Sequence, residues 1–435
     1  MAFIADKQTL EDLNLLGKFK PQSIYNLFNK VRTTGGERLL ESMFQQPLTD
    51  PDAINIRSGI FRYFQDNALV FPVSQTVFLR AENFLSQGTG GNKLWVLAMS
   101  LRRKITATLL RDGQFAALQD GMAATVELLR SLRAFAAVLD TAGSPYHAQA
   151  TELKALLANQ RLDGVVAASG HLSAWQQARY DFLLRNALRD EIEKILNHLY
   201  ALDVYMAVSE VAKARNFTYA RALPKAQNLV RTTALYHPAL EHAVANSIDL
   251  DSQSNLLFLT GANMAGKSTF MKSFGIAVYL AHMGFPVAAH HMEFSVRDGL
   301  YSSINVPDNL SMGYSHFYAE VLRVKTVAQD VAAGKDLVVI FDELFKGTNV
   351  KDAYDATLAV TAAFAAYRHC FFLISTHIIE VGEALKKERI GGQYAYMPTV
   401  MEGTIPRYPY RLKEGITNDR HGMMIIGNEQ ILEMM

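Results

Sequence analysis

One stretch, "LLFLTGANMAGKSTF" at residues 256–270, restricts the possible folds more than any other part of the 435-residue chain. Its uninterrupted apolar run predicts a strand that is buried on both faces of a parallel sheet. The spacing G-x-x-x-x-G-K-[ST] follows at once, and the residues after it are suited to a helix. Strand, glycine-rich loop and helix in this order predict a phosphate-binding loop (P-loop) in an α/β domain.

Such a loop binds the phosphates of a nucleotide, so we expect a nucleotide together with Mg²⁺. Its backbone N–H groups and the positive end of the following helix attract phosphate oxygens. Lys267 neutralises the outer phosphates, and the hydroxyl of Ser268 is a candidate ligand of the metal. The residues expected to contact the nucleotide are Gly261, Ala262, Asn263, Met264, Ala265, Gly266, Lys267, Ser268 and Thr269.

Two further apolar runs end in polar residues that suit the same site. "LVVIFDE" ends in Asp342 and Glu343, and "CFFLIST" is followed by His377. One strand-end carboxylate can hold Mg²⁺ and a second can orient the attacking water, so we assign Asp342 to the metal and Glu343 to the general base. His377 can either reach the γ-phosphate or cap its strand, and the spacing does not decide between these roles.

The periodicity changes near the middle of the chain. Apolar residues recur at three- and four-residue steps up to about Leu223, which is typical of an all-α domain. Short β-branched and aromatic runs alternate with helices from about Asn228. We therefore expect an all-α domain over residues 1–223 and an α/β domain with a mostly parallel sheet over residues 224–435. Within the second domain, "QYAYMPTVMEGTIPRYPYRL" predicts two antiparallel strands turning near Glu402 and Gly403.

One helix of the all-α half is expected to be long. No glycine or proline occurs between Ser173, a plausible N-cap, and Asn216. Apolar residues from Leu184 to Met206 form one stripe along this segment. A single helix would measure about 60 Å at 1.5 Å per residue. The alternative is a bundle helix that is broken by a kink.

Composition excludes several other classes of protein. Lys plus Arg number 43 against 42 for Asp plus Glu, so no overall positive field indicates nucleic acid. The single cysteine, Cys370, excludes a disulfide framework, fits a reducing compartment and is expected in the core. No apolar run approaches the roughly 20 residues of a membrane span. We expect a cytoplasmic protein without membrane association.

Taken together, these motifs resemble those of the MutS family of DNA mismatch-repair ATPases, a branch of the ABC-type ATPases. "TGANMAGKST" is similar to the family's TGPNMGGKST, and "DELFKGTNVKDA" resembles its DE-x-x-[RK]-GT-S-x-x-D-[GA]. "STHIIEV" resembles its [AS]-T-H-[YF]-x-E-L. "DNLSMGYSHFYAEV" is similar to the segment that carries the family's signature serine, which corresponds to Ser315 here.

The resemblance extends from about Gln8 to Met424 and includes the helical half. It implies an all-α core and lever domain followed by an ABC-type P-loop ATPase domain. The mismatch-binding, connector and clamp domains of the family have no counterpart among these residues. Only "ANQRLDGVVAASGHL" separates helix from helix where the family inserts its clamp.

The resemblance also implies that the nucleotide is ATP, and it implies how the site works. Two ATPase domains face each other, in a homodimer or in a heterodimer with another MutS-like subunit. Ser315 of one subunit then acts in trans on the nucleotide of the other, beside the catalytic residues Lys267, Glu343 and His377.

Contacts to the base are less clear from the sequence. The family commonly stacks an aromatic residue on adenine, but the aligned stretch "EHAVANSI" has Ala243 and Val244. We therefore expect Val244 to line the nucleotide site, with base contacts that are looser or that come from His242.

Two hypotheses for the function remain open. The resemblance implies DNA as a partner, without mismatch specificity, and favours a DNA-dependent ATPase of the repair or recombination type. The alternative is a nucleotide-switched protein-interaction module of the ABC-ATPase class with no useful DNA affinity. The only tight basic cluster of the helical half, at residues 102–104, is expected to be a solvated helix face rather than a DNA contact.

Overall fold

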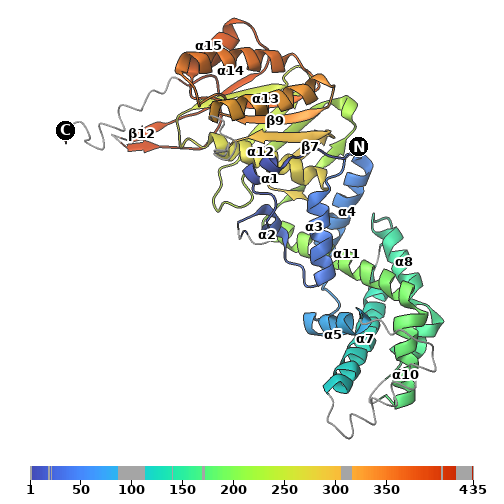
Figure 1. Cartoon of the computed structure of the whole chain (residues 1–435). Coiled ribbons are helices and arrows are strands. Elements are labelled where there is room, and N and C mark those ends of the chain that lie inside the picture. The colour runs from blue at the N-terminus through green and yellow to red at the C-terminus, as the bar shows by residue number, and fades with distance from the viewer. Residues whose placement is uncertain are drawn as a thin grey trace. The chain divides into compact units, whose positions relative to one another are not determined.

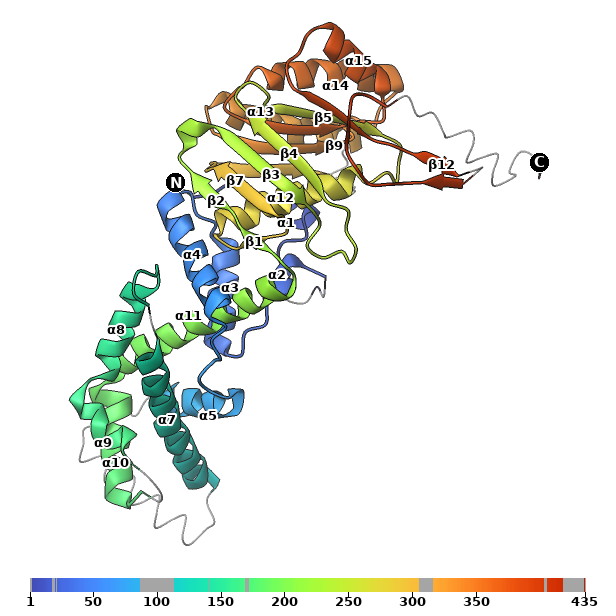
Figure 2. The same cartoon turned by 180° about the vertical axis from the view of Figure 1, so that it is seen from behind.

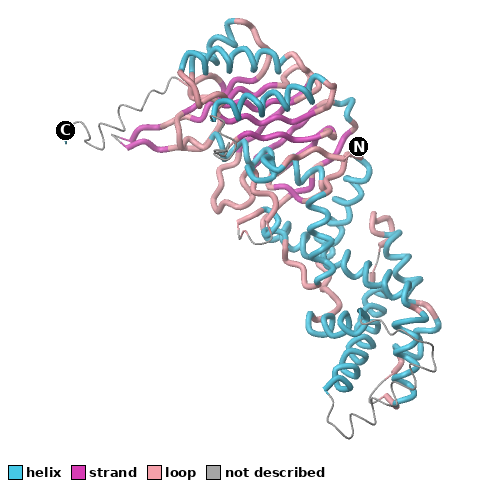
Figure 3. Tube along the Cα trace, viewed as in Figure 1, coloured by secondary structure: helices cyan, strands magenta, loops and turns pink. Residues whose placement is uncertain are grey.

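The chain divides into two compact units. The computed structural model describes residues 2–17, 20, 22–86, 113–139, 141–168, 172–304, 316–402, 405–417 and 434. The sheet unit comprises Met1–Phe28, Met43–Ser58 and Val211–Met435, and the helical unit comprises Asn29–Ser42 and Gly59–Glu210. Strands are confined to the sheet unit among the described residues (Figure 3). The expected fold class, helices followed by an α/β region with a mostly parallel sheet, is confirmed.

The helical unit is a bundle around one apolar core. Its largest helices, α7 (Gly113–Val138) and α11 (Arg189–Ala214), contribute buried leucines such as Leu132 and Leu199. Three helices, α3 (Thr34–Gln45), α4 (Pro51–Asn67) and α11, have residues in both units. The remaining segments are α5 (Gln75–Ser86), α8 (His147–Leu157), a 3-10 turn (Gln160–Leu162), α9 (Asp163–Val166) and α10 (Ala174–Phe182).

The prediction of one uninterrupted helix after Ser173 is wrong, and the kinked alternative is correct. Ser173 does cap α10, because its hydroxyl accepts the N–H of Gln176 at 3.3 Å. However, a π-helical segment (Leu183–Ala187) follows α10, and the N–H of Leu188 donates to the carbonyl of Leu183 at 2.9 Å. The chain changes direction here before α11 begins (Figures 1 and 2). A π turn needs no glycine or proline, so the sequence does not reveal it.

The main sheet places three expected strands side by side. Its order is β14-β11-β5-β10-β9-β8, with all strands parallel except β14. The predicted apolar runs form β5 (Leu256–Gly261), β9 (Leu337–Asp342) and β10 (Phe371–Ser375), and all three are almost fully buried. The other strands are β8 (Gly299–Ser303), β11 (Gln393–Met397) and β14 (Lys413–Glu414).

Helices cover both faces of this sheet (Figures 1 and 2). The helix α12 (Lys267–His282) packs on one face, where Gly275 lets it approach Ile340 of β9. On the other face α13 (His316–Ala332), α14 (Val350–Ala365) and α15 (Ile379–Lys387) share a core with Phe258 and Phe341. Both faces can be covered because successive side chains of a strand point to opposite faces of the sheet.

Smaller sheets complete the unit. A four-stranded sheet has the order β2-β7-β3-β4, and two short pairs, β1-β6 and β12-β13, are antiparallel. The predicted C-terminal pair is therefore present as β12 (Val400–Glu402) and β13 (Ile405–Arg407), but the preceding segment is β11 of the main sheet. Gly403 lies outside the described residues. The remaining bounds are β1 (Thr218–Tyr219), β2 (Arg221–Leu223), β3 (Leu229–Leu235), β4 (Asn246–Asp251), β6 (Pro286–Val287), β7 (His291–Ser295), α1 (Lys7–Asp12), α2 (Ile24–Phe28) and a 3-10 turn (Lys225–Gln227).

Two further expectations concern burial. Cys370 is fully buried, as expected for a core residue, and burial raises the pKa of its thiol to about 11. Its Sγ donates to the carbonyl of Lys335 at 3.1 Å. Among the described residues, no helix combines the length and the apolar character that crossing a membrane requires.

His282, at the end of α12, is a fully buried neutral imidazole. Its Nε2 accepts the backbone N–H of Arg297 at 2.9 Å, so the proton is on Nδ1, which donates to the carbonyl of Val278 at 2.8 Å. Burial lowers the pKa of His282 to about 3. Both ring nitrogens are satisfied only in the neutral state.

This burial predicts a pH dependence of stability. Because the folded pKa lies below the ordinary value of 6.5, the unfolded chain binds a proton between these values that the folded chain does not. The unfolding free energy should therefore fall as pH drops below 6.5, by about 1.4 kcal/mol per unit from this residue. Between pH 7 and 5, the melting temperature of His282→Gln should fall less than that of the parent. His290→Gln, at an exposed histidine, should follow the parent, and equal pH dependence of all three would contradict the prediction.

Candidate nucleotide site

The glycine-rich loop lies between β5 and α12, as the sequence predicts. Gly261 ends β5 and Lys267 begins α12, so residues 262–266 form the turn. The Nζ of Lys267 donates to the carbonyls of Gly261 and Ala262 at 2.8 and 3.2 Å. Met264 is 80% exposed with a φ of 69°. The lysine therefore folds back over the loop, with its ammonium beside backbone oxygens.

Two positions of this loop accept only glycine. Gly261 and Gly266 have φ values of 140° and 103°, which side chains rarely adopt. A Cβ at Gly261 would lie 2.8 Å from the carbonyl oxygen of Met397 in β11, and one at Gly266 would lie 2.9 Å from the ring of Tyr410. The loop is thus packed directly against β11 and against the segment that contains Tyr410.

The two acidic residues lie at the same edge of the sheet as the loop. In the strand register Ser375 of β10 is opposite Asp342 on one side and Leu259 on the other. The hydroxyl of Ser375 donates to the carboxylate of Asp342. The N–H of Glu343 donates to the carbonyl of Ser375 at 3.1 Å. The backbone of Glu343 has a φ of 55°, an uncommon value for a residue other than glycine. β10 therefore fixes both acidic residues.

The charges of the site influence one another. Burial lowers the pKa of the Lys267 ammonium, whereas the carboxylates of Glu343 and Asp342 act in the opposite direction. The two carboxylates offset the positive charge of Lys267. The site therefore attracts polyphosphate only if the loop and the helix supply further positive potential. That potential comes from the start of α12.

His377 lies next to the residue assigned as the base. Its Nδ1 is 3.9 Å from Oε1 of Glu343, and its side chain is 56% exposed. The hydroxyl of Thr376, rather than His377, accepts the N–H of Ile378 at the end of the strand. The arrangement therefore leaves the imidazole of His377 available beside Glu343.

A cavity of about 470 Å³ opens beside the loop. Val244 lines it, together with Ala243 and His242. Glu343 forms part of the wall. The other lining residues are Leu235, His237, Leu240, Glu241, Asn246, Ala262, Asn263, Met264, Gly266, Lys267, Ser268, Thr269, Phe270, Ser273, Met397 and Tyr410.

Several lining side chains were not foreseen from the sequence, among them Tyr410 and His237. Tyr410 is held by Asn246, whose Nδ2 donates to the Tyr410 carbonyl at 2.9 Å and whose Oδ1 accepts the N–H of Leu412 at 2.7 Å. His237 is half-buried, and this burial lowers its pKa to about 4, with Lys272 adding to the effect. No local pattern marks Tyr410, because its partner lies 164 residues earlier. In the sequence, His237 lies in the stretch "LYHPAL".

Some of the expected residues are not part of the described structure. Ser315 lies outside the described residues, and so do residues 102–104 of the basic cluster. Asn349, in the stretch "DELFKGTNVKDA", is the N-cap of α14, and its Oδ1 accepts the N–H of Asp352 at 3.0 Å.

Comparison with known proteins assigns both halves of the chain. Residues 8–251 match the family model described as MutS domain III, and residues 257–432 match the model described as MutS domain V. Over 241 residues the chain is 26% identical to a DNA mismatch repair protein MutS from Petrotoga mobilis, which covers 54% of this chain and 29% of the relative.

Two further relatives carry the same description. A protein from Leuconostoc citreum is 32% identical over 196 residues, or 44% of this chain and 22% of the relative. One from Listeria welshimeri is 27% identical over 251 residues, or 56% of this chain and 29% of the relative. The chain thus matches less than a third of the length of each of these relatives.

The close packing of Gly261 predicts the effect of adding a methyl group there. Gly261→Ala places a Cβ 2.8 Å from the Met397 carbonyl, so β5 and β11 must separate and the loop must move. We expect a loss of about 2–3 kcal/mol in unfolding free energy and weaker ATP binding. Gly334→Ala is the matched control, because Gly334 has a φ of 80° with nothing within 4 Å of its Cβ. Urea unfolding and ATP titration of both variants test this, and equal losses would contradict the close contact.

Proposed function

This chain belongs to the MutS family, and we propose that it is a Mg²⁺-dependent ATPase that switches as a dimer and acts on DNA. The observation that carries the proposal is the meeting of Lys267, Asp342, Glu343 and His377 at one edge of the sheet, beside a cavity of 470 Å³. We propose residues 1–223 as the core and lever part and residues 224–435 as the ATPase part.

The catalytic roles follow from positions around the loop. Lys267 and the start of α12 bind the phosphates, and Glu343 orients the attacking water and accepts its proton. His377, close to Glu343, senses the γ-phosphate. Catalysis of this kind depends mostly on positioning and charge, which suits side chains held by strand ends.

The donor set suits Mg²⁺. The hydroxyl of Ser268 and the carboxylate of Asp342 are oxygen ligands of the kind that Mg²⁺ prefers. Among the described residues, no group of three or more histidines, cysteines and acids forms a cage for a metal. A metal that takes few protein ligands and otherwise water and phosphate oxygens fits this site. When bound, it would neutralise charge on the phosphates.

The adenine base of the nucleotide has a candidate aromatic neighbour in this chain. Ala243 and Val244 line the cavity but provide no ring, whereas Tyr410 lines it and its ring lies close to Gly266. We propose that the adenine base packs against Tyr410 and Val244. Aromatic rings and nucleobases stack favourably, so this contact would compensate for the missing aromatic residue of the 240–244 loop.

The switch requires a second subunit. We propose that Ser315 contacts the nucleotide of a partner subunit, in a homodimer or with another MutS-like chain. A γ-phosphate that binds the closed dimer better than the open one shifts the equilibrium toward closure. At ATP concentrations of 100 times its dissociation constant, linkage supplies about 2.7 kcal/mol per site.

The helix α11 is the element that we propose as the lever. It has 26 residues, about 39 Å at 1.5 Å per residue, and its residues from Val211 onward belong to the sheet unit. A helix shared by both units can convey a movement at the nucleotide to the helical unit. We place the protein in the cytoplasm, where ATP and DNA are both available.

If Glu343 is the general base, replacing it should stop ATP hydrolysis without affecting ATP binding. Glu343→Gln should bind ATP normally but hydrolyse it roughly 10²- to 10⁴-fold more slowly, because the residue no longer accepts the proton. Lys267→Ala should lose ATP binding itself. Glu388→Gln, at an exposed glutamate at the end of α15, is the control and should hydrolyse normally. Normal turnover by Glu343→Gln would show that the base is another residue.

DNA action is tested by turnover and by salt. If the protein acts on DNA, then duplex, mismatched or branched DNA should stimulate ATP hydrolysis, and binding should weaken as salt rises because phosphate contacts release counterions. Mismatched DNA should bind no better than matched duplex. Absence of both stimulation and salt-sensitive binding would favour the alternative, a nucleotide-switched module whose partner is a protein.

A further inference from the structure

The N-terminal segment extends the edge of the main sheet. Ile4 pairs with Gly299 at the start of β8, and its N–H and carbonyl bond to Asp298 and Leu300, each at 2.8 Å. A Cβ at Gly299 would lie 2.6 Å from Ile4, so this approach depends on glycine. The helix α1 follows directly, with Asp6 as its N-cap. The segment is therefore an integral part of the sheet unit.

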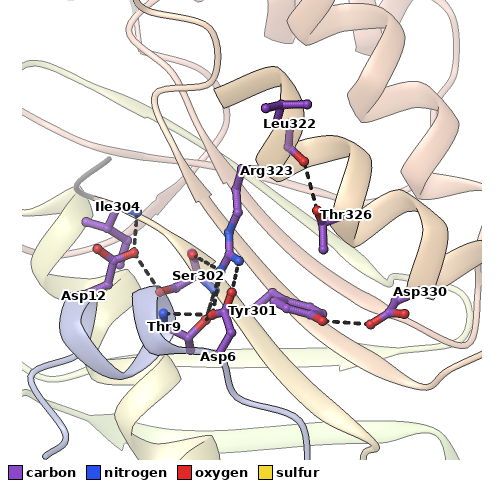
Figure 4. A network of polar contacts seen from close by, with 10 residues as sticks. All are labelled: Asp6, Thr9, Asp12, Tyr301, Ser302, Ile304, Leu322, Arg323, Thr326 and Asp330. Carbon is purple, nitrogen blue, oxygen red and sulfur yellow. Dashed lines mark hydrogen bonds and ion pairs between the residues drawn. The ribbon is translucent and has the colours of Figure 1, made fainter. Parts of the chain in front are cut away.

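The polar side chains of α1 bind the far end of β8 (Figure 4). The carboxylate of Asp12, which is 6% exposed, accepts the hydroxyl of Ser302 and the N–H of Ile304, both at 2.9 Å. The hydroxyl of Thr9 accepts the N–H of Ser302 at 3.0 Å. Strand β8 is at the edge of the sheet, so these backbone groups have no further strand to pair with. α1 takes the place of that strand.

Arg323 joins α13 to the same point. Its guanidinium bonds to both carboxylate oxygens of Asp6, to the hydroxyl of Thr9 at 3.1 Å and to the carbonyl of Ser302 at 2.7 Å. The ring of Tyr301 packs against it at 5.1 Å (Figure 4). Burial raises the pKa of Asp6, but the bonds from Arg323 and Thr9 lower it more, so the carboxylate stays ionised. Arg323 is 8% exposed and Asp6 is 36% exposed, so this charge pair is half-buried, and its many bonds make it costly to separate.

The two elements held in this way flank one segment. β8 ends at Ser303 and α13 begins at His316, and the residues between them include Ser315. α1 thus fixes the backbone on both sides of the residue that the proposed function places at the partner's nucleotide. A displacement of about 1 Å in a catalytic group can lower a rate by 10²-fold.

We propose that α1 is a positioning element for ATP hydrolysis, in which Asp12 and Arg323 hold the two flanks of residues 305–315. Neither residue lines the nucleotide cavity, so both act through the chain and not on the nucleotide. This inference rests on the proposed function, and it adds that the N-terminal segment controls turnover.

The test compares Asp12→Ala with Asp12→Asn. The alanine variant leaves the buried N–H of Ile304 without its acceptor, whereas asparagine keeps an acceptor of the same shape. Asp12→Ala should exchange the Ser302 and Ile304 amides at least 10-fold faster, lower kcat about 10-fold and leave the Kd for ATP unchanged. Asp12→Asn should recover most of the turnover. Glu11→Ala, at an exposed neighbour on α1, should match the parent in all three measurements.

A milder pair keeps the test valid if Asp12→Ala fails to fold. Thr9→Val removes one hydroxyl from the network, and Thr326→Val removes an exposed one on α13 whose partner is the Leu322 carbonyl. Only Thr9→Val should speed exchange at Ser302 and lower kcat. Faster exchange with unchanged kcat, or unchanged exchange in Thr9→Val, would overturn the inference. A parent protein without ATP turnover would refute the proposed function. The contact of α1 with β8 would then be tested by the amide exchange rates of Ser302 and Ile304 alone.

Discussion

The parallel pairing of β10 with β5 on one side and β9 on the other is the interaction on which the rest of the structure depends. Because this register aligns Ser375 with both Leu259 and Asp342, the phosphate loop and the acidic residues meet at one sheet edge. The same strand supplies the carbonyl that binds the N–H of Glu343. A slip of one residue would turn every side chain of β10 to the opposite face. Stability and site geometry therefore share one constraint.

Charge balance is the second feature that connects fold and site. The side chain of Lys267 is 5% exposed, and burial alone disfavours its charged form. The acids at the neighbouring strand ends offset this, and the carbonyls of Gly261 and Ala262 satisfy its donors. A nucleotide would replace these carbonyls by phosphate oxygens, which are stronger acceptors. The site is thus arranged for an anion before one binds.

The N-terminal segment shows how distant parts of the chain complete the sheet unit. Thr9 and Asp12 satisfy backbone groups of β8 that lie about 290 residues later, and Arg323 closes the network from α13. At an edge strand, unpaired N–H groups need a partner or water. Here the first helix of the chain is that partner, which is why the compact sheet unit includes Met1–Phe28 although most of the unit begins at Val211.

The sequence by itself determined the strands, the loop and their chemical character. Apolar runs identified β5, β9 and β10, because a strand buried on both faces must be apolar throughout. The glycine spacing located the loop for the same local reason. Tertiary structure alone decided the π segment after α10, the Asn246–Tyr410 contact and the network of Asp6, Thr9, Asp12 and Arg323. The π segment needs no glycine or proline that would mark it in the sequence. The polar contacts depend on groups brought together from far apart in the chain, and no local pattern encodes which distant partner a polar side chain will meet.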